Sequence, residues 1–186
     1  MTEKRALRRQ NFARLQELSC ARKEAQSKAI VAILSRHSSF IEAETVFSYA
    51  AMPSEPDLDA LRSTFPEKRW GLSRVADDGQ SLSFHRVAPG VELTRSDYGF
   101  LEPDPKTSPL ITQPDLILIP GVGFDPSTKA RLGRGKGHYD RYLGPLKLAN
   151  TPPTLIGVCF SIQETEIPVE AHDVSMDFLV TENGLI

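Results

Sequence analysis

The sequence has 186 residues, 40% of them hydrophobic and 25% charged, so we expect one domain, residues 1–186, with its own apolar core. No apolar run approaches the roughly 20 residues that span a bilayer, and no apolar segment follows the basic N-terminus, so neither a membrane anchor nor a secretory signal is expected. The net charge of −2 and the pI near 6.1 argue against a nucleic-acid-binding protein, but basic clusters at 1–28 and 129–141 suggest a small anionic ligand.

The first part of the chain predicts helices before and after a short strand. Apolar residues recur at helical spacing in residues 3–18 and 21–37, so we expect an N-terminal helical segment, residues 1–37. For this segment alone, a solvated basic face is the simpler interpretation. Residues 45–51 are rich in β-branched and aromatic types and predict a strand. A helix is expected to start within SEPDLDALRSTF, with Ser54 or Asp57 as its N-cap.

A hairpin and a proline-rich loop are predicted next. Residues 69–75 and 81–87 flank the sequence DDGQ (77–80), and an Asp-Gly pair is typical of a hairpin turn. In the second strand, Leu82, Phe84 and Arg86 alternate with Ser81, Ser83, His85 and Val87, which predicts one face in contact with water. Four prolines between residues 102 and 114 indicate a linker or surface loop.

The second half of the chain alternates buried strands with a helix. Short apolar runs at 115–121, 154–160 and 177–182 predict strands, and a helix is expected at about 137–148. This order indicates an α/β fold: a three-layer α/β/α arrangement whose open sheet is mostly parallel or mixed, with helices on both faces. Cys159 lies within an apolar strand and is interpreted as an inert core thiol. The two cysteines form no disulfide framework, which favours a cytoplasmic protein.

The most informative stretch is a glycine-rich segment between a buried strand and a helix. Gly133, Gly135 and Gly137 alternate, so the backbone there can adopt positive φ and approach a ligand closely. Successive amide groups in such a turn form an anion-binding nest, and the N-terminus of the following helix adds its dipole. Without charged neighbours, a flexible solvated connection would be the better interpretation.

Charged side chains in the same stretch favour phosphate binding. Arg131, Arg134 and Lys136 supply positive charge, and Asp140 in the following helix is a candidate ligand for Mg²⁺. A Walker A motif and the G-x-G-x-x-G dinucleotide fingerprint are both absent. Zinc spacing among the four histidines is absent too, as is a G-x-S-x-G nucleophile motif. We call residues 131–139 the phosphate loop.

The motifs of this chain resemble those of the 5-formyltetrahydrofolate cyclo-ligase family, also called methenyltetrahydrofolate synthetases. The run RLGRGKGHYDRYL (131–143) is similar to the family signature, and further landmarks follow in the family's order over nearly the whole chain. They are Lys4 with Arg8, Tyr49 with Glu55, Tyr98 with Gly99, Glu102 and Pro103, Pro120 with Gly121, Phe124 and Asp125, Ile156 with Gly157, Phe160 and Gln163, and Pro168 with Glu170, His172 and Asp173. Two residues depart from the pattern: His138 stands where a tyrosine is usual, and Ala130 where a glycine often occurs.

The resemblance implies an ATP- and Mg²⁺-dependent ligase of folate and one-carbon metabolism. It would convert 5-formyltetrahydrofolate to 5,10-methenyltetrahydrofolate with release of ADP and phosphate. In the family's reaction the formyl oxygen attacks the γ-phosphate of ATP, and N10 then closes the ring as phosphate leaves. Phosphoryl transfer of this kind needs positioning and charge neutralisation more than a protein nucleophile. We expect small-molecule substrates, no nucleic acid or membrane partner, and a monomer.

The resemblance also assigns roles to residues. Arg131, Arg134 and Lys136 would be catalytic, and Asp140 and Asp173 would bind the metal. The ATP-binding residues would be Lys4, Arg5, Arg8, Arg131, Leu132, Gly133, Arg134, Gly135, Lys136, Gly137, His138 and Tyr139. The folate-binding residues would be Ala50, Glu55, Tyr98, Arg134, Gly135, Lys136, Gly137 and His138. Tyr98, Phe100 and Tyr139 are candidates for stacking on the pterin.

Alternatives remain open at several of these residues. Asp173 is also typical of a turn, and Glu55 of the first turn of a helix, where the dipole stabilises an acid. For the whole chain, one alternative is a family member whose folate activity is redirected or lost, for which the departure at His138 is the support. The other is a non-catalytic nucleotide- or RNA-binding module that uses the basic N-terminus.

Overall fold

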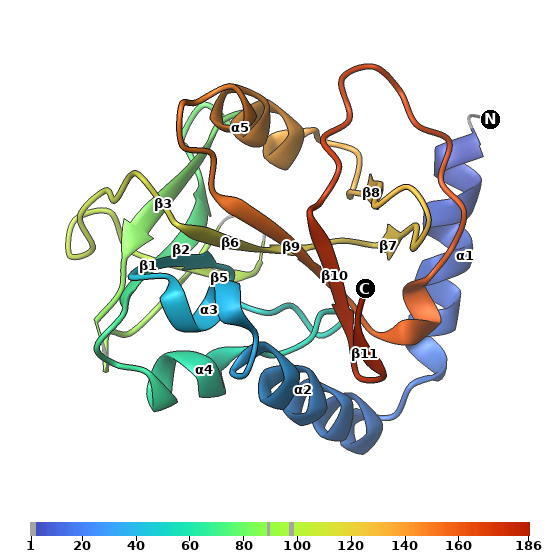
Figure 1. The fold of residues 1–186 in the computed structure, drawn as a ribbon, viewed down its shortest axis with the longest axis horizontal. Coiled ribbons are helices and arrows are strands. Elements are labelled where there is room, and N and C mark those ends of the chain that lie inside the picture. Colours follow the sequence, from blue (N-terminus) through green and yellow to red (C-terminus); the bar gives the residue numbers. More distant parts are fainter. Residues whose placement is uncertain (1–2, 89, 97–98) are drawn as a thin grey trace.

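A computed structural model describes residues 3–88, 90–96 and 99–186 and confirms the predicted α/β fold (Figure 1). A seven-stranded sheet forms its centre, and its five central strands are parallel, while the two edge strands run antiparallel to their neighbours. The order across the sheet is β11 (Gly184–Leu185), β10 (Phe178–Thr181), β9 (Thr154–Val158), β6 (Leu116–Pro120), β1 (Thr45–Ser48), β2 (Arg69–Val75) and β3 (Leu82–Arg86).

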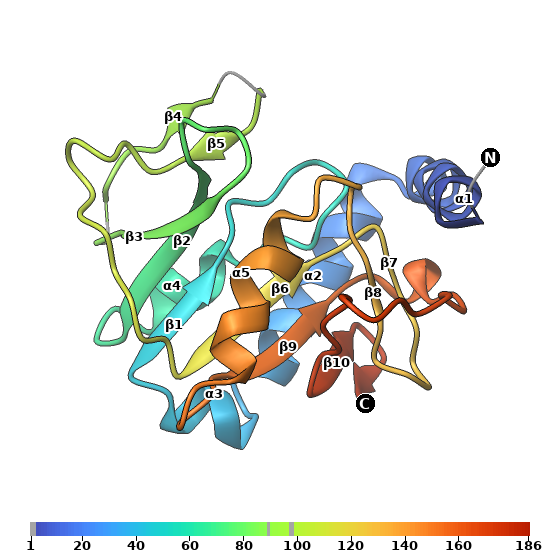
Figure 2. The same cartoon turned by 90° about the horizontal axis from the view of Figure 1, so that it is seen from above.

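The continuous apolar runs of the central strands serve two cores, one on each face of the sheet. Val46 packs in one core and its neighbour Phe47 in the other, and Leu116 and Ile117 divide in the same way. The first face is covered by α2 (Cys20–Leu34), α3 (Ser38–Glu42) and α4 (Asp59–Thr64), and the second by α5 (His138–Lys147) (Figures 1 and 2). In the described part of the chain, no helix is long and apolar enough to cross a membrane.

The strand order changes direction between β1 and β6. After β1 the chain crosses to β2 on one side, whereas β6 pairs with the other side of β1 and is followed outward by β9 and β10. In open α/β sheets such a switch point leaves a crevice beyond the carboxyl ends of the strands, where ligands bind. Here those ends lead into Tyr49 and Ala50 after β1, and into Gly121 after β6.

Helix α1 (Glu3–Glu17) lies at one end of the molecule, beside a small hairpin made of β7 (Gly123–Phe124) and β8 (Arg131–Leu132) (Figures 1 and 2). Leu7 and Phe12 of the helix pack on an apolar cluster that includes Leu132. Asn11 is fully buried, and its Nδ2 donates to the carbonyl oxygens of Val122 (3.2 Å) and Gln163 (3.4 Å). These contacts bring the basic N-terminus to the start of the phosphate loop.

The structure corrects several predicted boundaries. The first strand ends at Ser48, three residues earlier than predicted, and α3 and the β7–β8 hairpin were not anticipated. Helix α4 begins at Asp59, and its N-cap Leu58 makes no side-chain hydrogen bond. Asp57 Oδ1 instead accepts from the amide of Asp59 (2.9 Å). Ser54 therefore lies outside the helix, and its expected capping role is wrong.

The predicted wet face of β3 is confirmed at Ser81, which is exposed, but is wrong at His85. His85 is 7% exposed, and one of its ring nitrogens lies 2.7 Å from the carbonyl oxygen of Ser108. The proline-rich segment folds back along this edge strand, and the amide of Ile111 donates to the carbonyl oxygen of Phe84 (2.9 Å). A short hairpin of β4 (Thr94–Arg95) and β5 (Leu101–Glu102) precedes it. The alternation in the sequence is real, but a segment later in the chain pairs along the edge of β3 and contacts His85.

Asp125 fixes the turn that links β7 to β8. Its Oδ1 accepts from the amide and hydroxyl of Ser127 (2.9 and 2.7 Å), and its Oδ2 accepts from the amide of Ile167 (3.2 Å). Burial works to raise the pKa of this carboxyl group, but the hydrogen bonds outweigh burial and lower the pKa to about 2. The charged form is therefore favoured in the folded protein.

We expect Asp125→Asn to destabilise the protein by about 2 kcal/mol at pH 7, because the pKa in the folded state lies roughly two units below the ordinary value of about 3.9. A lowered folded-state pKa contributes stability that is complete above about pH 4 and is lost as the pH falls toward 2. Urea unfolding of the two proteins at pH 7 and pH 3 measures this. A difference between the two proteins that stays constant over this range would contradict the assignment.

Candidate active site

The larger of two neighbouring cavities, which we call the first cavity, has a volume of about 330 Å³ and lies at the switch point of the sheet. Its walls come from the carboxyl ends of β1, β2 and β6, from the segments that follow them, and from the phosphate loop. The lining residues are Tyr49, Ala50, Met52, Glu55, Ser73, Val75, Gly79, Leu82, Phe100, Leu101, Pro120, Gly121, Arg131, Gly133, Arg134, Lys136, Gly137, His138 and Tyr139.

The second cavity, of about 150 Å³, lies between α1, the phosphate loop and the segment before β10. Its lining is rich in charge: Lys4, Arg8, Arg131, Leu132, Gly133, Gly135, Gly137, Asp140, Glu170, His172 and Asp173. Arg131, Gly133 and Gly137 line both cavities. The phosphate loop is therefore the wall between a large cavity and a small charged one.

The glycines of the loop serve two different purposes. Gly135 and Gly137 have φ of 94° and 68°, the left-handed conformation that favours glycine. Gly133 is not left-handed, contrary to the simple alternation, but a Cβ there would lie 2.7 Å from Nη1 of Arg131. Gly137 is also the N-cap of α5, so the last two residues of the phosphate loop, His138 and Tyr139, already belong to the helix. The loop thus reaches a helix N-terminus beside both cavities, the arrangement that favours anions.

Arg131 is the buried cation at the centre of the site. Its side chain is only 4% exposed, and its Nη2 lies 3.0 and 2.9 Å from the two carboxylate oxygens of Asp140. Its guanidinium carbon lies 5.2 Å from the ring centroid of Tyr139. Within the described residues, the buried Nε has no hydrogen-bond partner. An unpaired buried donor is costly, and this one belongs to a side chain that lines both cavities.

Arg134 and Glu55 form a second ion pair, at the first cavity. Nη2 of Arg134 lies 3.0 Å from Oε1 of Glu55 and 2.9 Å from the hydroxyl of Ser54. The other carboxylate oxygen of Glu55, whose side chain is 5% exposed, accepts from the amide of Met52 (3.0 Å). Since α4 begins at Asp59, Glu55 does not lie in the first turn of a helix, and that alternative is wrong.

Burial and the Glu55 carboxylate act together on two tyrosines of the first cavity. Burial is the larger cause, and the nearby negative charge of Glu55 adds to it, so the pKa of Tyr49 and that of Tyr139 both lie above the usual value. The hydroxyl of Tyr49 donates to the carbonyl oxygen of Pro56 (2.9 Å). Both phenols therefore stay neutral at ordinary pH and act as flat apolar surfaces with a polar tip.

Helix α1 delivers two cations to the second cavity. Nζ of Lys4 lies 2.6 Å from Oδ2 of Asp173 and 3.5 Å from Oε2 of Glu170. Nε of Arg8 donates to the carbonyl oxygen of Gly133 (2.7 Å), which ties the helix to the phosphate loop. Arg5 is exposed and is absent from the lining that the described residues give either cavity.

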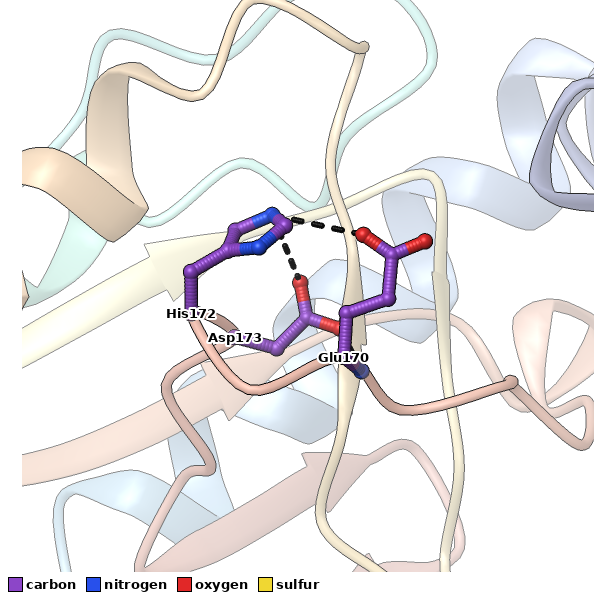
Figure 3. Close-up of side chains that lie close together, drawn as sticks. All are labelled: Glu170, His172 and Asp173. Atoms are coloured by element: carbon purple, nitrogen blue, oxygen red, sulfur yellow. Dashed lines mark hydrogen bonds and ion pairs between the residues drawn. The ribbon is translucent and has the colours of Figure 1, made fainter.

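Three potential metal ligands meet in the segment before β10 (Figure 3). Glu170, His172 and Asp173 offer ligand atoms within 4.8 Å of one another, and Figure 3 shows the imidazole beside both carboxylates. Burial works to raise the pKa of Asp173, but the hydrogen bonds from Lys4 and from the amide of Glu170 lower it overall. Asp140 lines the same cavity. The second cavity therefore holds carboxylate oxygens, the donors that Mg²⁺ prefers.

The structure brings together most of the residues that the sequence singled out. Lys4, Arg8, Asp140 and Asp173 meet at the second cavity, while Ala50, Glu55, Arg134, Lys136, His138 and Tyr139 meet at the first. Leu132 lines the second cavity although it packs in an apolar cluster. Phe100 lines the first cavity, and Tyr98 lies outside the described residues.

Some lining residues were not assigned a role from the sequence. Glu170 belongs to the quoted P-x-E-x-H-D motif, and its place beside two other ligand types was the available signal. The β2–β3 hairpin contributes Ser73, Gly79 and Leu82 to the first cavity. No local sequence pattern indicates that a hairpin forms a cavity wall. Only the packing of the hairpin against the phosphate loop reveals it.

Sequence comparison links the chain to known proteins. The model of the 5-formyltetrahydrofolate cyclo-ligase family matches residues 1–182. A 5-formyltetrahydrofolate cyclo-ligase of Mycolicibacterium smegmatis is 35% identical over 155 residues, which are 78% of each chain. One from Saccharomyces cerevisiae is 36% identical over 120 residues, which cover 59% of this chain and 55% of the yeast protein.

Structural comparison agrees with the sequence match. A solution structure of 5,10-methenyltetrahydrofolate synthetase from Aquifex aeolicus superposes with a TM-score of 0.83 at 29% identity. The superposition covers 99% of this chain and 92% of the other. The order and geometry of the whole fold are therefore shared, and the resemblance is not confined to the phosphate loop.

Proposed function

The chain belongs to the 5-formyltetrahydrofolate cyclo-ligase family, and on this premise we propose that it converts 5-formyltetrahydrofolate to 5,10-methenyltetrahydrofolate with ATP and Mg²⁺. One observation carries the proposal: a single loop rich in glycine and cations is a shared wall of two cavities. A reaction that transfers a phosphoryl group to a folate needs the two ligands in adjacent sites, and cavities that share lining residues provide such sites.

The first cavity suits the folate. Its lining joins apolar and aromatic side chains, including Tyr49, Phe100 and Tyr139, to the carboxylate of Glu55, and flat ligands favour such a mixture. A carboxylate accepts two parallel hydrogen bonds, and the 2-amino and N3–H groups of a pterin donate two. The charged second cavity and the phosphate loop suit the triphosphate of ATP.

The chemistry requires stabilisation of charge rather than a protein nucleophile. The formyl oxygen attacks the γ-phosphorus, the bond to the β-phosphate oxygen breaks, and ADP leaves. N10 then attacks the activated carbon and loses its proton, and phosphate departs as the ring closes. Arg131, Arg134 and Lys136 neutralise the charge that spreads over the transferred phosphoryl group.

Asp140 and Asp173 would hold Mg²⁺, which when bound neutralises phosphate charge. The oxygen donors in the second cavity support this choice, and Glu170 adds a third carboxylate beside them. His172 is a less usual partner for Mg²⁺ and remains on the exposed side of the cluster.

The three acids assigned to the pterin and to the metal each form an ion pair with a cation of the site before ligands bind. The pairs are Glu55 with Arg134, Asp140 with Arg131, and Asp173 with Lys4. Phosphate competes for the cations, and the acids are then released to the pterin and the metal. A phosphate that draws Arg134 away from Glu55 leaves this carboxylate free for the pterin, so we expect ATP and folate to promote each other's binding.

The test is direct. Purified protein with ATP, Mg²⁺ and 5-formyltetrahydrofolate should give the near-ultraviolet absorbance of the methenyl product, with one ADP formed for each product. ADP formation that requires a different formylated or carboxylated metabolite would indicate a redirected family member. Affinity for RNA that falls steeply with salt, without turnover, would instead favour a non-catalytic binding module.

Asp140→Asn should raise the Mg²⁺ concentration for half-maximal activity by about tenfold, because the amide is a neutral and weaker ligand than the carboxylate. A magnesium titration at saturating ATP measures the change. Asp59→Asn is the matched control, since Asp59 also pairs with an arginine (Arg62, 3.0 Å) but lies on α4, away from both cavities. An unchanged titration for Asp140→Asn would remove this residue from the metal site.

A further inference from the structure

The turn between β2 and β3, residues 76–81, is built rigidly by its own contacts. Oδ1 of Asp78 accepts from the amides of Gln80 and Ser81 (2.8 Å each), and Oδ2 accepts from the hydroxyl of Ser81 (2.5 Å). The amide of Gly79 donates to the carbonyl oxygen of Ala76 (2.9 Å), and Gly79 has a φ of 67°. These hydrogen bonds therefore fix the shape of the turn independently of its contacts with the rest of the molecule.

Two side chains from the first turn of α5 form hydrogen bonds with the β2–β3 turn. Nε2 of His138 lies 3.0 Å from the carbonyl oxygen of Gly79, and Nη2 of Arg141 donates to the carbonyl oxygen of Gln80 (2.6 Å). A carbonyl oxygen only accepts, so Nε2 of His138 carries the hydrogen. A Cβ at Gly137 would lie 2.7 Å from Nη1 of Arg141, so the arginine lies directly over the end of the phosphate loop.

The β2–β3 turn, which His138 and Arg141 contact, forms part of the wall of the first cavity. Gly79, Leu82 and His138 line that cavity together with Glu55 and Lys136, which are assigned above to the folate and the phosphate. Arg141 itself is exposed, and contacts between exposed groups contribute little to overall stability. The two contacts therefore matter for the shape of the cavity more than for the folding of the chain.

We propose that His138 and Arg141 are positioning residues that fasten the β2–β3 turn to the phosphate loop and so set the width of the folate cavity. This inference rests on the proposed function of the first cavity. It gives a role to Arg141, which lines neither cavity among the described residues, and it places the action of His138, which departs from the usual tyrosine, at the first cavity alone. Release of the turn widens the folate site and leaves the cations around ATP in place.

Steady-state kinetics of single variants test the proposal. Arg141→Met and His138→Phe should each raise the KM for 5-formyltetrahydrofolate about five- to tenfold, as expected for the loss of one hydrogen bond. The KM for ATP should change by less than about twofold. Arg141→Lys and His138→Gln keep a donor and should restore most of the folate KM. Arg69→Met is the matched control, because Arg69 lies at the opposite end of β2 and is paired only loosely with Glu44 (3.7 Å).

Calorimetric titration of 5-formyltetrahydrofolate into the same proteins gives a reading that needs no turnover. Weaker folate binding by Arg141→Met and His138→Phe, with a thermal midpoint like that of the parent chain, supports the proposal. Unchanged folate affinity in both variants, or equal loss of folate and ATP affinity, overturns it. If the parent chain binds folate but forms no product, the proposed reaction is wrong and this binding test remains valid. If the parent chain binds no folate, both the proposed reaction and the positioning role are wrong.

Discussion

Arg131→Ala is expected to lower kcat/KM for ATP at least tenfold and up to about a hundredfold. A charge-assisted hydrogen bond contributes about 1.5–3 kcal/mol, and each 1.36 kcal/mol corresponds to a tenfold change in rate. The variant also leaves Asp140 without its partner beside the phosphates, which adds repulsion. Steady-state kinetics with varied ATP, at saturating folate and Mg²⁺, measure the effect.

Two companion variants separate chemistry from folding. Arg131→Lys keeps the charge but loses the Nη2 group that contacts both oxygens of Asp140, so its activity should lie between those of alanine and the parent chain. The double variant Arg131→Ala/Asp140→Ala removes the unpaired acid and should recover stability without recovering activity. Parent-like kinetics of the single alanine variant would remove Arg131 from the site.

Glu55→Gln is expected to raise the KM for 5-formyltetrahydrofolate at least tenfold while changing the KM for ATP by less than about threefold. Glutamine has almost the same shape, but its amide group presents hydrogen-bond donors where the pterin also presents donors. Arg134 loses a carboxylate partner in this variant, and its charge stays available to phosphate. Binding of ATP is therefore largely preserved.

Measuring the KM for both substrates distinguishes a folate-binding role of Glu55 from a structural role. Glu55 is buried and also accepts from the amide of Met52, so a purely structural role would disturb both substrates alike. Equal changes in the two KM values, accompanied by a lower thermal midpoint, would show that the carboxylate only supports the segment before α4. A selective loss of folate affinity at an unchanged midpoint would assign it to the pterin.

The two departures from the family pattern have different structural settings. Ala130 is 1% exposed and packs in the apolar cluster beneath α1, while its neighbour Lys129 takes the left-handed conformation with φ 59°. His138 instead faces the first cavity and the β2–β3 turn, where a change of side chain bears on the substrate.

The sequence alone was sufficient wherever the determinants are local. The phosphate loop places three glycines, three cations and the start of a helix within ten residues, so its chemistry follows from short-range geometry. The continuous apolar runs of β6 and β9 likewise indicate strands covered on both faces, because no other environment buries consecutive large side chains in a strand. These two features gave the α/β fold and the candidate anion site.

Tertiary structure decided everything that depends on the order of the strands. Lys4 meets Asp173 across 169 residues and Arg134 meets Glu55 across 79, and only the packing of the folded elements brings such distant segments together. The burial of His85 also depends on tertiary structure, because a segment that follows 23 residues later in the chain contacts its side chain. A hydrophobic pattern records which face of an element is buried, but not which other element buries it, because many partners present equivalent apolar surfaces.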